Sequence, residues 1–183
     1  MVYVAFLRGI NVGGNSIVSM ASIKKALVEL GLADVRTHIN SGNVIFSSRS
    51  SDTRRLAARI EKALEEGTGL PIKVLVMDHK ALRKLVGAIP PKWVDDKTMR
   101  TYVLLLWKEL DNRKILERLP ARPGVDNLRY EQGAVIWNVD RKDIAKSRMN
   151  RMAGTPAYKQ ITIRSANTMR KLNELTAQPG ERK

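Results

Sequence analysis

The 183-residue chain predicts an α+β protein made of two similar halves, each with an antiparallel sheet. Three observations lead to this prediction. Short apolar segments typical of strands alternate with segments of helical periodicity. The turns 40–43 (NSGN) and 131–134 (EQGA) indicate hairpins, which pair their strands antiparallel. The order of elements in the first half recurs after the chain is interrupted at Pro90 and Pro91.

The first half, residues 1–90, is expected to run strand, helix, strand, strand, helix, strand, helix. Ser19 can cap the first helix, and Gly31 helps to end it. Ser51 or Asp52 can start the second helix in the same way. The expected strands are 2–7, 35–40, 44–46 and 72–77, and the later helices reach residue 67 or 69 and cover 80–88.

The second half, residues 91–183, repeats this order. Asp140 can cap a helix that runs through Met152. Each half therefore matches the split strand-helix-strand pattern of ferredoxin-like domains, βαββαβ with a further helix, in which helices cover one face of the sheet. The other elements expected here are strands at 101–107, 127–130, 135–139 and 161–163, with helices at 112–119 and 167–175.

The second face of the first sheet is too apolar to lie in water as one patch. We therefore expect the two halves to pack on each other, the alternative being two open and solvated sheets. The residues that form this mixed face are Ile45, Leu75 and Met77 beside Arg36, His38 and Lys73.

The composition is strongly basic, with 33 Lys and Arg against 18 acids, a net charge of +15 and a pI of about 10.4. Such an excess suggests a polyanionic or phosphorylated partner, although a generally basic proteome is the alternative. The chain has no cysteine, which excludes disulfides and thiolate metal sites. The first apolar run is too short for a signal peptide or a membrane span, so a cytoplasmic protein without membrane contact is expected.

Residues 8–16, RGINVGGNS, have the outline of the phosphate-binding loop of nucleotide hydrolases. Asn15 stands where that loop needs lysine, Ile17 and Val18 separate the loop from the helix start, and the sheet is expected to be antiparallel. Hydrolysis of nucleoside triphosphates is therefore not expected.

The same loop could still hold a phosphate or carboxylate. Arg8 supplies a cation close to the side-chain amide of Asn11, and Gly13 and Gly14 leave backbone amides exposed. The alternative is that the glycines, with Gly9, only provide positive φ angles for a tight excursion of the chain.

Three motifs resemble the uncharacterised bacterial family called domain of unknown function 1697: LRGINVGG at 7–14, INSGNVIF at 39–46 and TIRSANTMRKL at 162–172. The resemblance implies a ferredoxin-like half followed by a second α/β part, and implies no activity. In the third motif Ser165 and Ala166 replace an expected asparagine and tryptophan, so any ligand contact of that ring is absent.

The motifs also supply candidate ligand-binding residues. Those retained in the third motif form a possible polar cluster together with Thr168, and the NSGN turn adds two further polar side chains. These candidates are Thr162, Arg164 and Asn167, with Ser41 and Asn43 from the turn.

Residues 141–171 carry nine basic side chains and one acid. On a helix, Ile144, Ala145, Met149 and Met152 would form the buried stripe. Such a cationic ridge suits the phosphates of a nucleic-acid backbone, and an ordinary solvated face is the alternative. The cations expected at solvent are Lys142, Lys146 and Arg151, with Arg148 near the border of the stripe.

Base stacking of the kind seen in RNA-recognition domains needs aromatic residues on the first and third strands. In the first half only Tyr3 could serve, since the third strand offers Asn43 and Ile45. Sequence-specific RNA recognition by that mechanism is therefore not expected. His38 and His79 are far apart in the sequence, and no catalytic motif, metal-ligand spacing or cofactor motif is recognised.

Taken together, these features favour a binding protein for a phosphate-bearing ligand, above all nucleic acid, that does not hydrolyse nucleoside triphosphates. The first alternative is an enzyme acting on a small phosphorylated or carboxylated metabolite. In that case Arg8 and Arg164 would anchor the ligand, and Asn11 or Asn43 would orient the reacting group. A further alternative is an interaction module with no ligand of its own.

Overall fold

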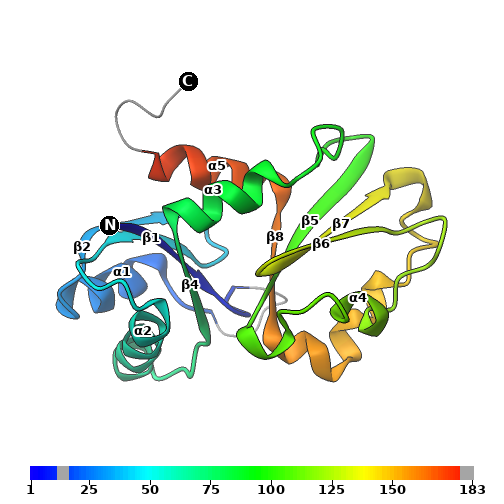
Figure 1. Cartoon of the computed structure of the whole chain (residues 1–183). Coiled ribbons are helices and arrows are strands. Elements are labelled where there is room, and N and C mark those ends of the chain that lie inside the picture. The colour runs from blue at the N-terminus through cyan, green and yellow to red at the C-terminus, as the bar shows by residue number, and fades with distance from the viewer. Residues whose placement is uncertain (12–16, 178–183) are drawn as a thin grey trace. The chain divides into compact units, whose positions relative to one another are not determined.

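The computed structural model describes residues 1–11 and 17–177, and the chain forms two compact units (Figure 1). One unit comprises Met1–Leu82 and the described residues from Glu174 onward, and the other is Arg83–Asn173. The boundaries between these units fall within the helices His79–Gly87 and Ala166–Thr176. The expected domain division after residue 90 stays a prediction. None of the helices in the described ranges is long and apolar enough to cross a membrane.

Each unit contains one four-stranded antiparallel sheet with helical segments on it, which confirms the expected α+β class and its two ferredoxin-like halves. In the first unit the strand order is β2-β3-β1-β4. That the two halves pack on each other stays a prediction. The elements of this part of the chain are β1 (Val2–Leu7), α1 (Met20–Glu29), β2 (Ala33–His38), β3 (Asn43–Ser47), α2 (Thr53–Thr68), β4 (Val74–Asp78) and α3 (His79–Gly87).

The two long helices of the first unit begin at side-chain caps, as the sequence predicts. The Ser19 hydroxyl accepts a hydrogen bond from the Ser22 amide at 3.0 Å. Asp52 accepts from the amides of Arg54 and Arg55, both at 3.0 Å, and these bonds lower the pKa of its carboxyl group. Gly69, at φ 73°, ends α2 in the left-handed conformation that glycine adopts at low cost.

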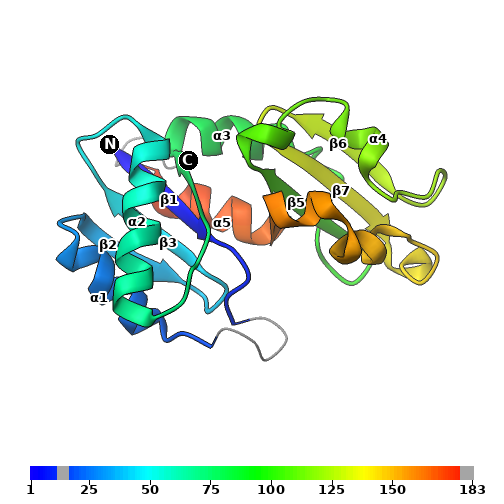
Figure 2. The same cartoon turned by 90° about the horizontal axis from the view of Figure 1, so that it is seen from below.

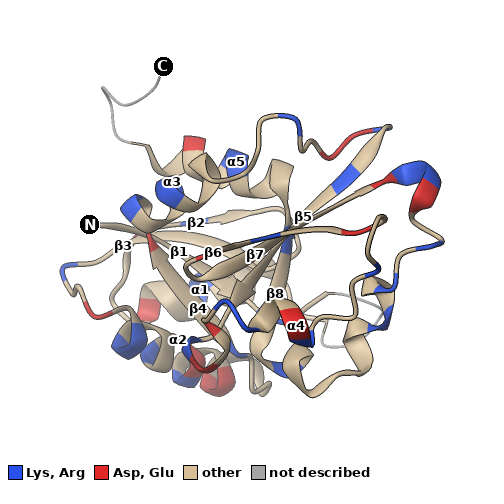
Figure 3. Cartoon of the chain, turned by 45° about the vertical axis from the view of Figure 1, so that its right-hand side comes forward, with Lys and Arg blue, Asp and Glu red and all other residues tan. Residues whose placement is uncertain are grey.

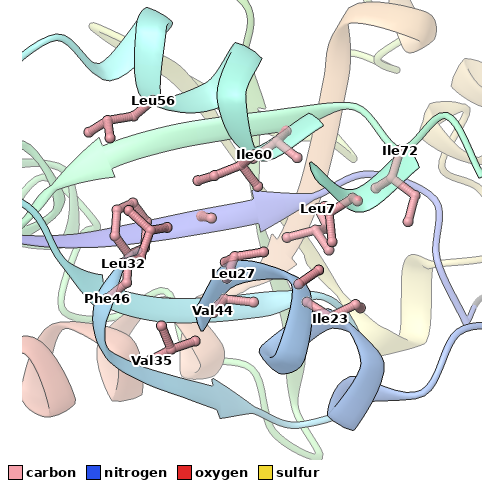
Figure 4. Close-up of a cluster of buried hydrophobic side chains, with 14 of the residues drawn as sticks. Leu7, Ile23, Leu27, Leu32, Val35, Val44, Phe46, Leu56, Ile60 and Ile72 are labelled. Carbon is pink, nitrogen blue, oxygen red and sulfur yellow. The ribbon is translucent and has the colours of Figure 1, made fainter. Parts of the chain in front are cut away.

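The core of the first unit lies between one face of its sheet and the helices α1 and α2 (Figure 4). Leu27 of α1 and Ile60 of α2 are fully buried there. The opposite face is apolar as expected, since Val4, Phe6 and Ile45 are also buried. Towards the edges of that face Leu75 and Met77 are half-buried and Arg36 is exposed, so it is only partly removed from water.

The second unit repeats the topology with the strand order β6-β7-β5-β8, and Figure 2 shows β5, β6 and β7 of this sheet. The strands of the two sheets follow one another in the same order, which confirms that the second half repeats the first. Its elements are β5 (Met99–Leu106), the 3-10 helix η1 (Lys108–Leu110), α4 (Ile115–Arg118), β6 (Asn127–Glu131), β7 (Ala134–Asp140), the 3-10 helices η2 (Arg141–Asp143), η3 (Met149–Gly154) and η4 (Pro156–Gln160), β8 (Ile161–Ser165) and α5 (Ala166–Thr176).

The expected helix from Asp140 through Met152 is wrong. Residues 141–160 instead form three short 3-10 helices, and the Asp140 side chain makes no capping hydrogen bond. Met152 and Met149 are buried as the helical pattern requires, but Ala145 is exposed. The expected helix 112–119 is likewise reduced to the four residues of α4.

Candidate functional site

The glycine loop of the first unit is closed by the side chain of Asn11. This residue has a φ of 54°, and its Nδ2 donates to the carbonyls of Val18 and Asn40, both at 2.9 Å. Its Oδ1 accepts from the Val18 amide at 2.9 Å. Because both amide protons are used inside the fold, Asn11 holds the loop ends together. Gly13 and Gly14 lie outside the described residues.

The NSGN turn lies against the start of the glycine loop. The Leu7 amide donates to the Gly42 carbonyl at 2.8 Å, next to the half-buried Arg8. Asn43 is fully buried and donates through Nδ2 to the His38 carbonyl and to the Ser41 hydroxyl, both at 3.2 Å. The structure therefore brings Arg8, Asn11, Ser41 and Asn43 together around one turn, and ligand contact by these residues stays a prediction.

The candidates of the third motif belong to the second unit. Arg164 is 7% exposed and donates through one terminal nitrogen to the Thr162 hydroxyl at 3.0 Å and to the Ile163 carbonyl at 2.8 Å. Burial lowers the pKa of Arg164 to about 10, so the guanidinium stays charged at neutral pH. Asn167 is exposed and donates to the Asp95 carbonyl at 2.7 Å. A surface shared by this group and the glycine loop stays a prediction.

Ser165, which replaces the expected asparagine of the third motif, caps α5. Its hydroxyl accepts from the Thr168 amide at 3.2 Å and lies 3.1 Å from the Thr168 hydroxyl. Ala166, in place of the expected tryptophan, is fully buried. At these two positions the chain therefore uses its residues to start and to pack a helix.

The basic segment, residues 141–160, joins β7 to β8 and contains six cations and one acid. All six cations are exposed, and Figure 3 shows Lys and Arg in blue along the chain after β7. The cations are therefore exposed although the expected helix is absent, and their contact with nucleic acid stays a prediction. The cations are Arg141, Lys142, Lys146, Arg148, Arg151 and Lys159.

The carboxylate of Asp126 holds the basic segment against the sheet. Its Oδ1 accepts from Trp137 Nε1 at 2.9 Å and from the Ser147 hydroxyl at 2.6 Å. Its Oδ2 accepts from the backbone amides of Arg122 at 2.8 Å and Arg148 at 3.4 Å. Asp126 thereby fixes the backbone from which the neighbouring cations project, and it replaces the hydrogen bonds that a regular helix would provide.

Some cations of the basic segment form ion pairs with acidic side chains and others do not. Lys146 lies 2.7 Å from an Asp143 oxygen, and this hydrogen bond lowers the pKa of the Asp143 carboxyl group. Lys142 lies 3.8 Å from Asp140. By contrast, neither side chain of Arg148 and Arg151 has a hydrogen bond or ion pair within the described part of the chain. These two arginines are the cations best placed to meet an external anion.

Known proteins share the sequence pattern and the architecture of this chain. Residues 1–137 match the family model described as protein of unknown function (DUF1697). The chain belongs to this family. A solved structure of a conserved bacterial protein from Streptococcus pneumoniae is similar, with a TM-score of 0.82 and 25% sequence identity over 96% of this chain and 98% of that one. Comparison with curated proteins gives no match.

Within this DUF1697 protein the matched residues include the glycine loop, the NSGN turn and Asp126. The match ends before the basic segment begins. Sequence reasoning missed Asp126, because its partners Ser147 and Arg148 lie 21 and 22 residues further along the chain. The local signal is an acid directly before β6.

Proposed function

We propose that this protein is a cytoplasmic nucleic-acid-binding protein that contacts the phosphate backbone through the basic segment and does not hydrolyse nucleoside triphosphates. The observation that carries the proposal is the pair Arg148 and Arg151. Both are exposed and have no ionic partner in the described residues, and Asp126 accepts a hydrogen bond from the backbone amide of Arg148. Arginines suit phosphate, because the guanidinium donates two parallel hydrogen bonds to its oxygens.

The charge balance supports backbone contact of this kind. Six exposed cations and one acid lie within twenty residues, in a chain of net charge +15. Each phosphate that a cation neutralises releases condensed counterions, so affinity falls steeply with added salt. The proposal therefore makes salt dependence its first observable property.

The metabolite-enzyme alternative has less support. It requires Asn11 or Asn43 to orient a reacting group, yet both side-chain amides donate their hydrogen bonds within the first unit. Arg8 and Arg164 remain candidate anchors under that alternative.

The double variant Arg148→Glu, Arg151→Glu is expected to weaken binding of a fluorescent single-stranded RNA by about 100-fold, because two phosphate contacts become repulsions. The slope of log affinity against log salt should become shallower by about 1.4, since each phosphate contact with a single strand contributes about 0.7. Fluorescence anisotropy between low and high salt measures both quantities.

The matched control is Arg54→Glu with Arg55→Glu, which makes the same charge change at exposed positions of α2 in the other unit. It should retain most of the affinity. An equal loss in both double variants would mean that net charge alone drives the interaction and would refute the proposed surface.

A further inference from the structure

The second unit contains a hollow of about 260 Å³ between its sheet and the segment after β7. Tyr102 and Trp137 line it from the sheet, and Met149, Met152 and Tyr158 line it from the 3-10 helices. Its walls are therefore largely aromatic rings and thioethers, surfaces that pack well against a planar ring. This volume is near the lower end of small-molecule sites, roughly 300 Å³, and suits one compact ligand.

The internal repeat explains how the hollow arises. In the first unit Tyr3 and Phe46 are register partners on β1 and β3, and their rings stack with centroids 5.5 Å apart. In the second unit Tyr102 and Trp137 are register partners on the corresponding strands β5 and β7, with centroids 5.3 Å apart. A stacked aromatic pair thus occupies the same two strands of each sheet, Tyr with Phe in the first unit and Tyr with Trp in the second.

The two pairs differ in the helical segment that comes after the third strand of each sheet. In the first unit this segment is the 16-residue helix α2, and Tyr3 and Phe46 are fully buried in the core that it closes. In the second unit residues 141–160 form only short 3-10 helices, and Tyr102 remains half-buried at the hollow. The hollow therefore occurs where the first unit has a full helix over the aromatic pair.

Arg100 adds a cation to this aromatic site. It lines the hollow and donates through a terminal nitrogen to the Tyr102 hydroxyl at 2.5 Å. That hydrogen bond raises the pKa of Arg100, so the guanidinium is charged at any physiological pH. The guanidinium therefore places a positive charge on the wall of the hollow, where it offers an anionic group on a ligand a charge-assisted hydrogen bond.

We infer that this hollow binds one small molecule that joins a planar aromatic ring to an anionic group. The ring packs against Tyr102, Trp137 and the methionines, and the anion accepts a hydrogen bond from Arg100. Nucleoside monophosphates and aromatic carboxylates share this chemistry. The inference is independent of the nucleic-acid proposal, because its site is the hollow and its key cation is Arg100 on β5.

Isothermal titration calorimetry with four probes tests the inference: adenosine 5′-monophosphate, indole-3-acetate, adenosine and inorganic phosphate. At least one of the two anionic aromatic probes should bind with a Kd below about 1 mM, the range of a weak but specific small-molecule site. It should bind at least about tenfold more tightly than adenosine or phosphate, since each of these lacks one half of the chemistry. Which of the two anionic probes binds identifies the ligand class. The inference would be overturned if inorganic phosphate bound as tightly as the anionic aromatic probes, or if neither of those two probes bound.

Two variants locate the binding. Arg100→Gln should weaken it about tenfold or more, because a charge-assisted hydrogen bond is lost. Ala153→Leu places extra side-chain volume at a residue that lines the hollow and should weaken binding to a similar degree. The control Ala145→Leu makes the same change at an exposed residue of the basic segment that does not line the hollow.

Circular dichroism melting confirms that each variant is folded before titration. If Arg100→Gln does not fold, Ala153→Leu decides alone. Unchanged affinity in folded Ala153→Leu would show that the ligand binds elsewhere and would refute the site. The variant Arg148→Glu, Arg151→Glu should leave adenosine 5′-monophosphate or indole-3-acetate bound, which separates this inference from the nucleic-acid proposal.

Discussion

Replacement of Asp126 by alanine is expected to destabilise the protein by about 4 kcal/mol, because several charge-assisted hydrogen bonds of roughly 1.5–3 kcal/mol each are lost together. The carboxylate accepts from Trp137 Nε1, the Ser147 hydroxyl and the amides of Arg122 and Arg148. Trp137 is 6% exposed, so its indole N–H would be left buried without an acceptor. Urea unfolding followed by tryptophan fluorescence measures the change.

Asp143→Ala is the comparison for this variant. Asp143 is an acid of the basic segment whose side chain pairs with Lys146, and such surface pairs contribute little to stability. It should unfold almost as the original protein does. A loss below about 1 kcal/mol for Asp126→Ala would contradict its role as the residue that positions the basic segment, since that is the value of one ordinary hydrogen bond. In folded protein the same variant should also weaken RNA binding, because Arg148 loses its backbone anchor.

Gly42→Ala is expected to cost about 3 kcal/mol, from a left-handed backbone that disfavours alanine and from overpacking. Gly42 has a φ of 77°, and a Cβ placed on it would lie 2.9 Å from Leu7 Cβ and 3.0 Å from two Ile10 side-chain atoms. The neighbours cannot yield easily, because Leu7 and Ile10 are both buried. The free energy of unfolding in urea gives the magnitude.

Gly9→Ala separates the two causes. Gly9 has a φ of 70° but has no atom within 4 Å of the position that a Cβ would take. This variant should lose only the backbone contribution, about 1 kcal/mol. Equal losses in the two glycine variants would show that the close approach of the NSGN turn to Leu7 does not matter for stability.

The parts of the fold that could be predicted from the sequence are those with local causes. Ser19 and Asp52 begin helices because their side chains reach amides two or three residues away. The turn at 40–43 fixes the first hairpin, and β3 begins at the Asn43 that closes it. Hydrophobic alternation along the strands predicts both sheets, because the same order of elements occurs twice.

The parts that could not be predicted depend on contacts distant in the sequence. The apolar spacing of Met149 and Met152 fits a helix, but Asp126 takes the Ser147 hydroxyl and the Arg148 amide from across the unit and favours short 3-10 helices. The hydrophobic periodicity of residues 141–152 cannot predict these hydrogen bonds to Asp126, because Asp126 lies outside that segment. The predicted exposure of the basic side chains is still correct, because they face solvent in the 3-10 helices as they would in a regular helix.

The aromatic hollow escapes sequence reasoning for a different reason. The requirement for stacking aromatics on the first and third strands is not met in the first half, where Tyr3 and its partner Phe46 are sealed in the core. In the second half the equivalent strands do carry such a pair, Tyr102 and Trp137, and both residues lie on strands that the sequence predicts. Asn11 shows a role that the sequence pattern does not reveal, because its side-chain amide closes the glycine loop through three hydrogen bonds. Ligand contact by Asn11 stays a prediction.

Photo-crosslinking of the protein to a single-stranded RNA that contains 4-thiouridine, with mass spectrometry of the crosslinked peptides, tests the proposed nucleic-acid surface most directly. Crosslinks should concentrate in residues 141–160 and should disappear in the variant Arg148→Glu, Arg151→Glu. Crosslinks confined to the first unit, or a crosslinking pattern that this double variant leaves unchanged, would contradict the account.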